Sequence, residues 1–331
     1  MPTIANFLNR YFNKEQHKPP PISTGSAAAL LVIYTLIYVV PFYLSSTTRP
    51  SRTLSRDAPS VIRARITSVS LSCVACSLIT FVILTSQGRA TNGEALHSMG
   101  YWPLGLAEAG RSLLLTAILF SGPLYETLLV DGAWRQWLSL HPVSSLFSEW
   151  TRWRNIVAGP FTEEVLFRSA SVPLMLVAQT SVARTIFLSP VIFGLAHFHH
   201  FYEFRLTHAH EPVVTGLLRS LLQFTYTSLF GAYATFLFLR TGSLLAIFVV
   251  HAFCNTMGLP RLWGRVEPAS DVDGFEGNED RDGGRAGSKR RKPSILWSVV
   301  YYVLLVAGAV GWWKNLGALT MSGNALVAMK I

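Results

Sequence analysis

The feature that most constrains this chain is a series of apolar stretches, each long enough to cross a lipid bilayer as a helix. Such a helix needs about 20 mostly apolar residues. Four stretches meet that length almost without charge, and four more meet it with polar interruptions. In chain order they cover residues 26–44, 66–85, 112–129, 156–178, 182–198, 213–239, 242–259 and 295–313. The sequence therefore predicts an all-α, polytopic integral membrane protein with about eight transmembrane helices.

Composition excludes the main alternatives for a chain of 331 residues. Hydrophobic residues make up 50% and charged residues 14%, whereas soluble domains carry roughly 25% charged residues. The three cysteines all lie inside apolar stretches, so a disulfide framework is not expected. The net charge of +10 comes mainly from loops between the apolar stretches. This distribution sets membrane orientation and does not indicate nucleic-acid binding.

The positions of the basic residues predict an orientation. The loops after the first, third, fifth and seventh stretches hold 17 of the 28 Lys and Arg residues. Because basic loops stay in the cytosol, these four loops are predicted to be cytosolic and both termini to lie across the membrane.

The predicted spans divide the chain into five segments. Residues 1–25 form a non-cytosolic tail, and 26–155 hold three transmembrane helices followed by an amphipathic interfacial segment rich in tryptophan. Residues 156–260 form a transmembrane core that holds most of the intramembrane charge. Residues 261–294 form a disordered basic loop that can touch anionic lipid. Residues 295–331 hold the last helix and a tail.

Charged residues inside the fourth stretch are the first candidates for function. Glu163, Glu164 and Arg168 lie near its start, and charge within a membrane span usually faces a bundle interior or a water-filled cavity. Glu164 and Arg168 are four residues apart and share a helix face, so they are predicted to form an ion pair. Glu163 is left without a partner in sequence. The alternative is that all three form a charged cluster that holds helices together.

Two further polar motifs follow on other helices. His197 ends the fifth stretch, and the seventh contains His251 and Asn255, which are four residues apart and face the same way. The predicted orientation places these residues and Glu163 in the cytosolic half of the membrane. They are therefore expected to line one intramembrane cavity, although satisfied core histidines are the alternative.

Such a cavity supports hydrolysis of an amide. A carboxylate in a low-dielectric pocket is a stronger general base, and a neighbouring imidazole helps to orient and deprotonate a water molecule. A second imidazole and an amide can donate hydrogen bonds to the developing oxyanion. These are the roles that Glu163, His197, His251 and Asn255 can fill.

Three motifs in this order resemble the type II CAAX prenyl endopeptidases of the abortive-infection/CAAX protease superfamily. The matching residues are Gly159-Pro160-x-Thr162-Glu163-Glu164-x-x-Phe167-Arg168, Phe193-x-x-x-His197 and His251-x-x-x-Asn255. The resemblance implies that Glu163 and His197 activate water and that His251 and Asn255 form an oxyanion hole. It also implies that Glu164 and Arg168 support Glu163.

The resemblance further implies a substrate and a location. The family removes the C-terminal aaX tripeptide from farnesylated or geranylgeranylated CAAX proteins, such as Ras-like small GTPases. It is a multi-pass family of the endoplasmic reticulum membrane with a site that faces the cytosol. No metal and no cofactor are expected.

Other interpretations remain open at this point. Cys254 directly precedes Asn255 and could act as the nucleophile of a thiol protease, although an inert core cysteine is the expected interpretation. Four further histidines could serve as zinc ligands, but a solvated polar loop is the preferred interpretation; they are His199, His200, His208 and His210. No His-Glu-x-x-His motif occurs in the sequence. A transporter could use the Glu, Arg and His residues as a proton relay, and a scaffold could use them as a structural network. The roles of Glu126 and Arg219 are unassigned; they could pair with each other, line a groove or reach the interface.

Overall fold

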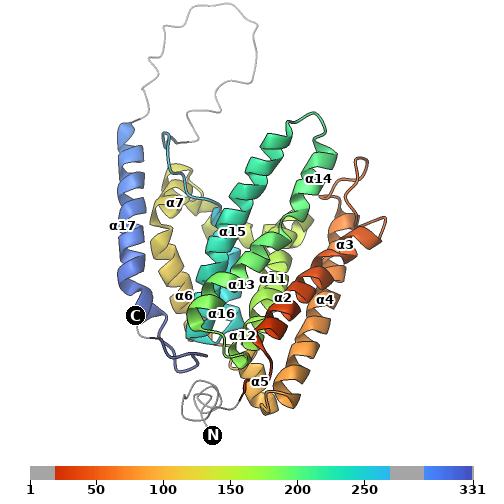
Figure 1. Cartoon of the computed structure of the whole chain (residues 1–331). Helices are drawn as coiled ribbons and strands as arrows, with labels where there is room; N and C mark the ends of the chain where they lie inside the picture. The colour runs from red at the N-terminus through yellow and green to blue at the C-terminus, as the bar shows by residue number, and fades with distance from the viewer. Residues whose placement is uncertain (1–18, 269–293, 330–331) are drawn as a thin grey trace, which may run out of the picture.

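The computed structural model describes residues 19–268 and 294–329, and every regular element in these two ranges is a helix (Figure 1). The predicted all-α class is therefore confirmed for this part of the chain. The helices are α2 (Thr24–Val39), α3 (Pro41–Leu44), α4 (Pro59–Ser86), α5 (Asn92–Ser98), α6 (Leu106–Leu119), α7 (Ser121–Tyr125), η1 (Glu126–Val130), α8 (Trp134–Leu138), α9 (His141–Ser148), α10 (Trp150–Trp153), η2 (Arg154–Ala158), α11 (Gly159–Glu164), η3 (Val165–Ala170), α12 (Val172–Val177), α13 (Val182–Ala196), α14 (His199–Thr207), α15 (Val213–Thr241), α16 (Leu244–Met257) and α17 (Ile295–Leu319).

Several of these helices are long and apolar enough to cross a membrane, as a polytopic membrane protein requires. Four meet both measures, and a fifth candidate is a helix pair bent by 82°. The four are Thr24–Leu44, Pro59–Ser86, Val182–Thr207 and Ile295–Leu319, and the bent pair joins Leu106–Leu119 to Ser121–Val130. Each of the five coincides with one predicted span.

The other three predicted spans, 156–178, 213–239 and 242–259, are helical but do not meet the same measures of length and hydropathy. α16 has only 14 residues, and 156–178 is divided into four short helical pieces. The described residues thus give four or five spans by length and composition, fewer than the eight predicted.

Prolines account for the division of 156–178. Pro160 lies in the first turn of α11 and Pro173 in the first turn of α12. Proline has no N–H to donate and its ring clashes with the carbonyl four residues earlier. A π-turn precedes each of these helices, η2 before α11 and η3 before α12. The wider turns carry the chain past the missing hydrogen bonds.

The ends of the bundle are distinct in Figure 1. α5 and α12 lie at one end, and α3, α7 and α14 lie at the other. The start of α2 contacts α12, where Thr24 donates to the carbonyl of Ala178 at 3.5 Å. Beyond α17, the carbonyl of Asn324 lies 3.0 Å from the ring of His97 in α5. Among the described residues, the first helix therefore begins, and the last helix ends, at the same end of the bundle.

The predictions for the loop 261–294 and the tail 1–25 can be compared with the structure only in part. The disordered loop predicted for 261–294 is wrong for its beginning, which is bound to α17. The backbone N–H of Val266 donates to Ser298 at 2.9 Å, and that of Arg261 donates to Tyr301 at 2.8 Å. Residues 269–293, and residues 1–18 of the predicted tail 1–25, lie outside the described residues.

The predicted interfacial segment folds as the three short helices α8, α9 and α10. Trp134, Trp137 and Trp150 are each at least 40% exposed, as expected for rings that face a lipid headgroup layer. The guanidinium of Arg63 in α4 lies 5.7 Å from the centre of the Trp150 ring. This contact holds α10 beside the start of α4.

Glycines allow α13 and α15 to pack closely next to the charged residues of η3. A Cβ added at Gly194 would lie 2.5 Å from the Ser228 hydroxyl oxygen. A Cβ added at Gly231 would lie 2.7 Å from the Pro190 side chain and 3.0 Å from Nη2 of Arg168. Small residues at a helix interface permit this approach in membranes, and here they make room for the Arg168 guanidinium.

Replacement of Gly231 by valine should destabilise the protein because the new methyl groups overlap Pro190 and Arg168. Overpacking of this kind costs about 1–3 kcal/mol of unfolding free energy. Thermal unfolding of the purified protein in detergent, followed by tryptophan fluorescence, measures the effect. Gly110→Val is the matched control because a Cβ at Gly110 meets nothing within 4 Å. A Gly231→Val protein as stable as the control would contradict this account of the packing.

Candidate active site

A cavity of about 810 Å³ lies among the helices and is lined by four of the six predicted site residues. Glu163 comes from α11, His197 from the end of α13, and His251 and Asn255 from α16. Residues that are up to 92 positions apart in the sequence thus share one wall. The other two predicted residues, Glu164 and Arg168, lie behind this wall and are buried.

Glu164 and Arg168 form the predicted ion pair. Nη1 of Arg168 donates to Oε1 of Glu164 at 3.1 Å, and the two side chains are 1% and 0% exposed. The Arg168 guanidinium also lies over the ring of Phe193, 4.8 Å from its centre, and 6.0 Å from the centre of the Phe230 ring. A buried charge is tolerated when it is paired in this way.

His251 joins this pair to Glu163. Its Nδ1 lies 2.7 Å from Oε1 of Glu164, and its Nε2 lies 3.9 Å from Oε2 of Glu163. Since Glu164 already accepts a hydrogen bond from Arg168, its carboxylate accepts from His251 as well, and Nδ1 is the donor. Nε2 is therefore the ring nitrogen turned toward Glu163 and the cavity.

His197 is oriented by its own helix. Its Nδ1 lies 3.0 Å from the carbonyl oxygen of Phe193, which can only accept, so Nδ1 carries the proton and Nε2 is an acceptor. The ring meets Phe193 edge to face, with centroids 4.8 Å apart. No hydrogen bond joins His197 directly to Glu163 in the part of the chain that the structure describes; both line the same cavity.

Asn255 is held at the far end of α16. Its Nδ2 donates to the backbone carbonyl of Asn155 in η2 at 2.8 Å. One amide proton is thereby used to fix the side chain, and the second remains able to donate. A carboxylate, two imidazoles and an amide donor around one cavity form a set of groups that can activate water and stabilise an oxyanion.

Several cavity residues were missed by the sequence analysis. Arg56, Arg65 and Arg154 line the same cavity, although the sequence assigned them only to cytosolic loops. Nothing in their spacing connects them, because Arg154 lies about a hundred positions from Arg56. The one sequence feature they share is a basic side chain in or next to a loop predicted to be cytosolic, on the side where the cavity was expected.

The predicted histidine loop is only partly correct. His199 and His200 begin α14 and line the cavity, so their assignment to a solvated loop is wrong. Nδ1 of His199 contacts the Ala196 carbonyl and Nδ1 of His200 lies 3.3 Å from Glu203. His208 and His210 are exposed, as a loop predicts.

Glu126 and Arg219 do not pair with each other. Glu126 binds Arg261 at 2.8 Å, and Arg219 stacks on Phe204 with 5.1 Å between the guanidinium and the ring centre. The side-chain hydrogen bond to Glu126 raises the pKa of Arg261. Across residues 19–268 and 294–329, no group of three or more His, Cys, Asp or Glu side chains is arranged to hold a metal ion.

The known proteins and the family model that this chain resembles are all described as CAAX prenyl proteases or endopeptidases. The family described as type II CAAX prenyl endopeptidase Rce1-like matches residues 145–257, which include all six predicted site residues. The chain is 40% identical over 70% of its length to a probable CAAX prenyl protease 2 of Schizosaccharomyces pombe, covering 81% of that protein. It is 33% identical over 73% of its length to the Arabidopsis thaliana CAAX prenyl protease 2, covering 82% of it.

The human CAAX prenyl protease 2 is 36% identical over 65% of this chain, with 66% of the human protein covered. No solved structure matches the chain. The matched region contains the four predicted site residues that line the cavity, and each of these three matches covers about two thirds or more of the relative's own length. The chain therefore belongs to the type II CAAX prenyl endopeptidase family.

Proposed function

We propose that this protein is an intramembrane endopeptidase that removes the C-terminal aaX tripeptide from prenylated CAAX proteins. The observation that carries the proposal is the single cavity lined by Glu163, His197, His251 and Asn255 in a chain of this family. Relatives described as CAAX prenyl proteases supply the substrate class. Farnesylated or geranylgeranylated Ras-like GTPases are the expected substrates.

The proposed reaction begins with a water molecule between Glu163 and His197. Glu163 takes a proton from the water, while the acceptor Nε2 of His197 orients it. The resulting hydroxide forms a C–O bond to the carbonyl carbon of the prenylated cysteine, and the carbonyl oxygen becomes an oxyanion. The C=O bond then re-forms and the C–N bond breaks. The proton held by Glu163 passes to the leaving amine, and the aaX tripeptide departs.

His251 and Asn255 are the proposed oxyanion donors. Asn255 offers the Nδ2 proton that Asn155 does not use. The proposed donor of His251 is an Nε2–H, and the contact of its Nδ1 with Glu164 fixes the orientation of the ring. Arg168 holds Glu164 in place, so the buried pair supports both His251 and, through it, Glu163.

Aromatic side chains give the cavity an apolar part for the prenyl chain. Tyr226, Phe230 and Tyr233 of α15 and Trp312 of α17 line it. A farnesyl or geranylgeranyl chain is wholly hydrocarbon, so burial of its surface against these rings is favourable. A cavity with one polar and one apolar part suits a lipidated peptide.

We also propose eight membrane crossings, with α11–α12, α15 and α16 completing the spans, in the endoplasmic reticulum membrane with the cavity open to the cytosol. The excess of Lys and Arg in the odd-numbered loops supports this orientation. Prenylated protein tails reach a membrane from the cytosol, which fits this side of the bilayer. The transporter alternative is not supported by the family to which the chain belongs.

Replacement of Glu163 by glutamine should abolish tripeptide release, because the amide cannot accept the proton from water. The expected fall in kcat is roughly 10²–10⁴-fold. Release of aaX from a farnesylated CAAX peptide by purified protein measures it. Cys254→Ala is the control, since Cys254 also lines the cavity but has no role in the proposed reaction.

An active Glu163→Gln enzyme, or an inactive Cys254→Ala enzyme, would refute the glutamate mechanism. Unchanged thermal unfolding of Glu163→Gln excludes loss of the fold as the cause. A purely structural scaffold would show no release with the wild-type protein.

Replacement of Asn255 by alanine should lower kcat by about 10²–10³-fold, the usual effect of losing one oxyanion donor. KM for the peptide should change little, because the donor acts on the transition state. Steady-state kinetics on the farnesylated peptide separates the two constants. A change confined to KM would assign Asn255 to substrate binding instead.

Tripeptide release should continue in the presence of EDTA, because Glu163 and His197 activate water without a metal in the proposed reaction. The activity of dialysed protein with and without chelator measures this. Loss of activity that returns on addition of Zn²⁺ would replace the proposed mechanism with metal-assisted hydrolysis.

A further inference from the structure

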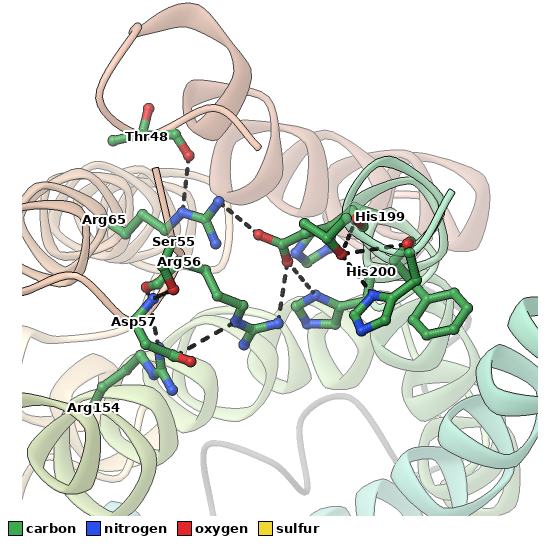
Figure 2. Close-up of polar contacts among 12 residues, drawn as sticks. Thr48, Ser55, Arg56, Asp57, Arg65, Arg154, His199 and His200 are labelled. Atoms are coloured by element: carbon green, nitrogen blue, oxygen red, sulfur yellow. Dashed lines mark hydrogen bonds and ion pairs between the residues drawn. The ribbon is translucent and has the colours of Figure 1, made fainter. Parts of the chain in front are cut away.

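A second group of charged side chains lines the cavity that holds Glu163. Arg56 lies in the loop before α4, Arg65 in α4, and Arg154 at the start of η2. Figure 2 shows Arg56 and Arg65 directed toward the same side as His199 and His200, with Arg154 beside Asp57. Three guanidinium groups are thus gathered at one part of the cavity wall.

Two carboxylates in this group balance part of its charge. Glu203, which is buried, accepts from Arg56 at 3.1 Å and from Arg65 at 3.0 Å. Asp57 accepts from Arg154 at 2.8 Å. Three cations face two anions, so the group holds one uncompensated positive charge before any charge on His200 is counted.

Arg56 and Arg154 are more accessible than Arg65, and each keeps an unused donor. Nε of Arg65 donates to the Thr48 carbonyl at 2.9 Å and Nη2 to Glu203. Within residues 19–268 and 294–329, Nη2 of Arg56 and Nη2 of Arg154 donate no hydrogen bond. Nη1 of Arg65 is also unused, but that side chain is only 14% exposed. The side chain of Arg56 is 42% exposed and that of Arg154 is 21% exposed. Two guanidinium edges therefore keep donors for a further acceptor.

The electrostatics of Arg56 also favour an added anion. Burial lowers the pKa of Arg56, and Glu203 offsets this only in part. The neighbouring guanidinium groups of Arg154 and Arg65 lower it further. A bound carboxylate would relieve this repulsion.

Direct contacts connect this group to the proposed catalytic residues on two sides. Nε of Arg154 donates to the side chain of Asn155 at 2.9 Å, and the carbonyl of Asn155 holds Asn255 at 2.8 Å. On the other side, the ring of His200, which binds Glu203, lies 5.9 Å from the ring of His197. The arginines are therefore a few side-chain contacts from the site of attack.

We propose that Arg56 and Arg154 bind the C-terminal carboxylate of the substrate, an inference that rests on the proposed function. In a CAAX chain this carboxylate ends the third residue beyond the scissile bond. Three extended residues span about 10 Å. The unused Nη2 of each guanidinium can donate one charge-assisted hydrogen bond to the carboxylate, which fixes its position as well as its charge. Binding of the carboxylate by Arg56 and Arg154 would place the peptide bond three residues earlier at the proposed catalytic residues.

The test compares a farnesylated CAAX peptide with a free C-terminal acid to the same peptide with a C-terminal amide. Wild-type protein should cleave the amide with a kcat/KM at least about tenfold lower, since a charge-assisted hydrogen bond is lost. This comparison needs no variant, so misfolding cannot affect it. Mass spectrometry of the released tripeptide measures both reactions.

Arg56→Gln and Arg154→Gln should each lower kcat/KM for the acid while leaving the amide nearly unchanged, so the preference for the acid shrinks. Arg52→Gln is the matched control. Arg52 lies in the same loop as Arg56, is exposed and does not line the cavity. This variant should keep the full preference.

Each outcome decides between the two proposals. Equal cleavage of acid and amide by wild-type protein would overturn carboxylate binding and leave the proposed protease function intact. A preference for the acid that survives in both arginine variants would overturn the assignment to Arg56 and Arg154. Failure of the wild-type protein to cleave either peptide would overturn the proposed function together with the inference.

Discussion

The buried contact between Glu164 and Arg168 is the interaction on which the rest of the structure depends. Both charges are excluded from water, and removal of either partner would leave the other uncompensated, at a cost of about 3–5 kcal/mol. Glu164 of α11 also contacts His251, so the pair links α16 to α11 and, through Arg168, to η3. It also requires space beside α15, which Gly231 provides. The ion pair, the close packing of α15 at Gly231 and the orientation of the His251 ring therefore depend on one another.

The same region shows how irregular helix geometry serves a polar cavity. Pro160 and Pro173 divide the polypeptide into short pieces joined by π-turns. Non-helical backbone at membrane depth is tolerated where it is buried in protein or lines a cavity. The π-turns η2 and η3 flank α11, which carries Glu163, and Glu163 lines the same cavity as the aromatic side chains of α15. The cavity therefore combines charged and apolar walls within one bundle.

Local patterns in the sequence predicted much of this arrangement. The spacing of four residues predicted the Glu164–Arg168 ion pair. The lengths of the apolar stretches predicted the all-α class and the candidate spans. What failed depends on contacts between distant residues. Asn255 binds a backbone carbonyl in η2, and the loop arginine Arg56 faces the cavity; neither fact has a periodic signature. The eight-span count stays a prediction, because residues 156–178, 213–239 and 242–259 are helical but do not meet the length and hydropathy expected of a span.

The attachment of α17 at both ends has a consequence for how the chain assembles. Residues 261–266 hold its beginning through Ser298 and Tyr301. At its other end, Arg240 of α15 donates to Thr320 at 3.1 Å and to the Gly317 carbonyl at 3.0 Å. The buried guanidinium of Arg240 therefore depends on acceptors in and after α17. Loss of the last helix would leave this charge inside the bundle without those hydrogen bonds.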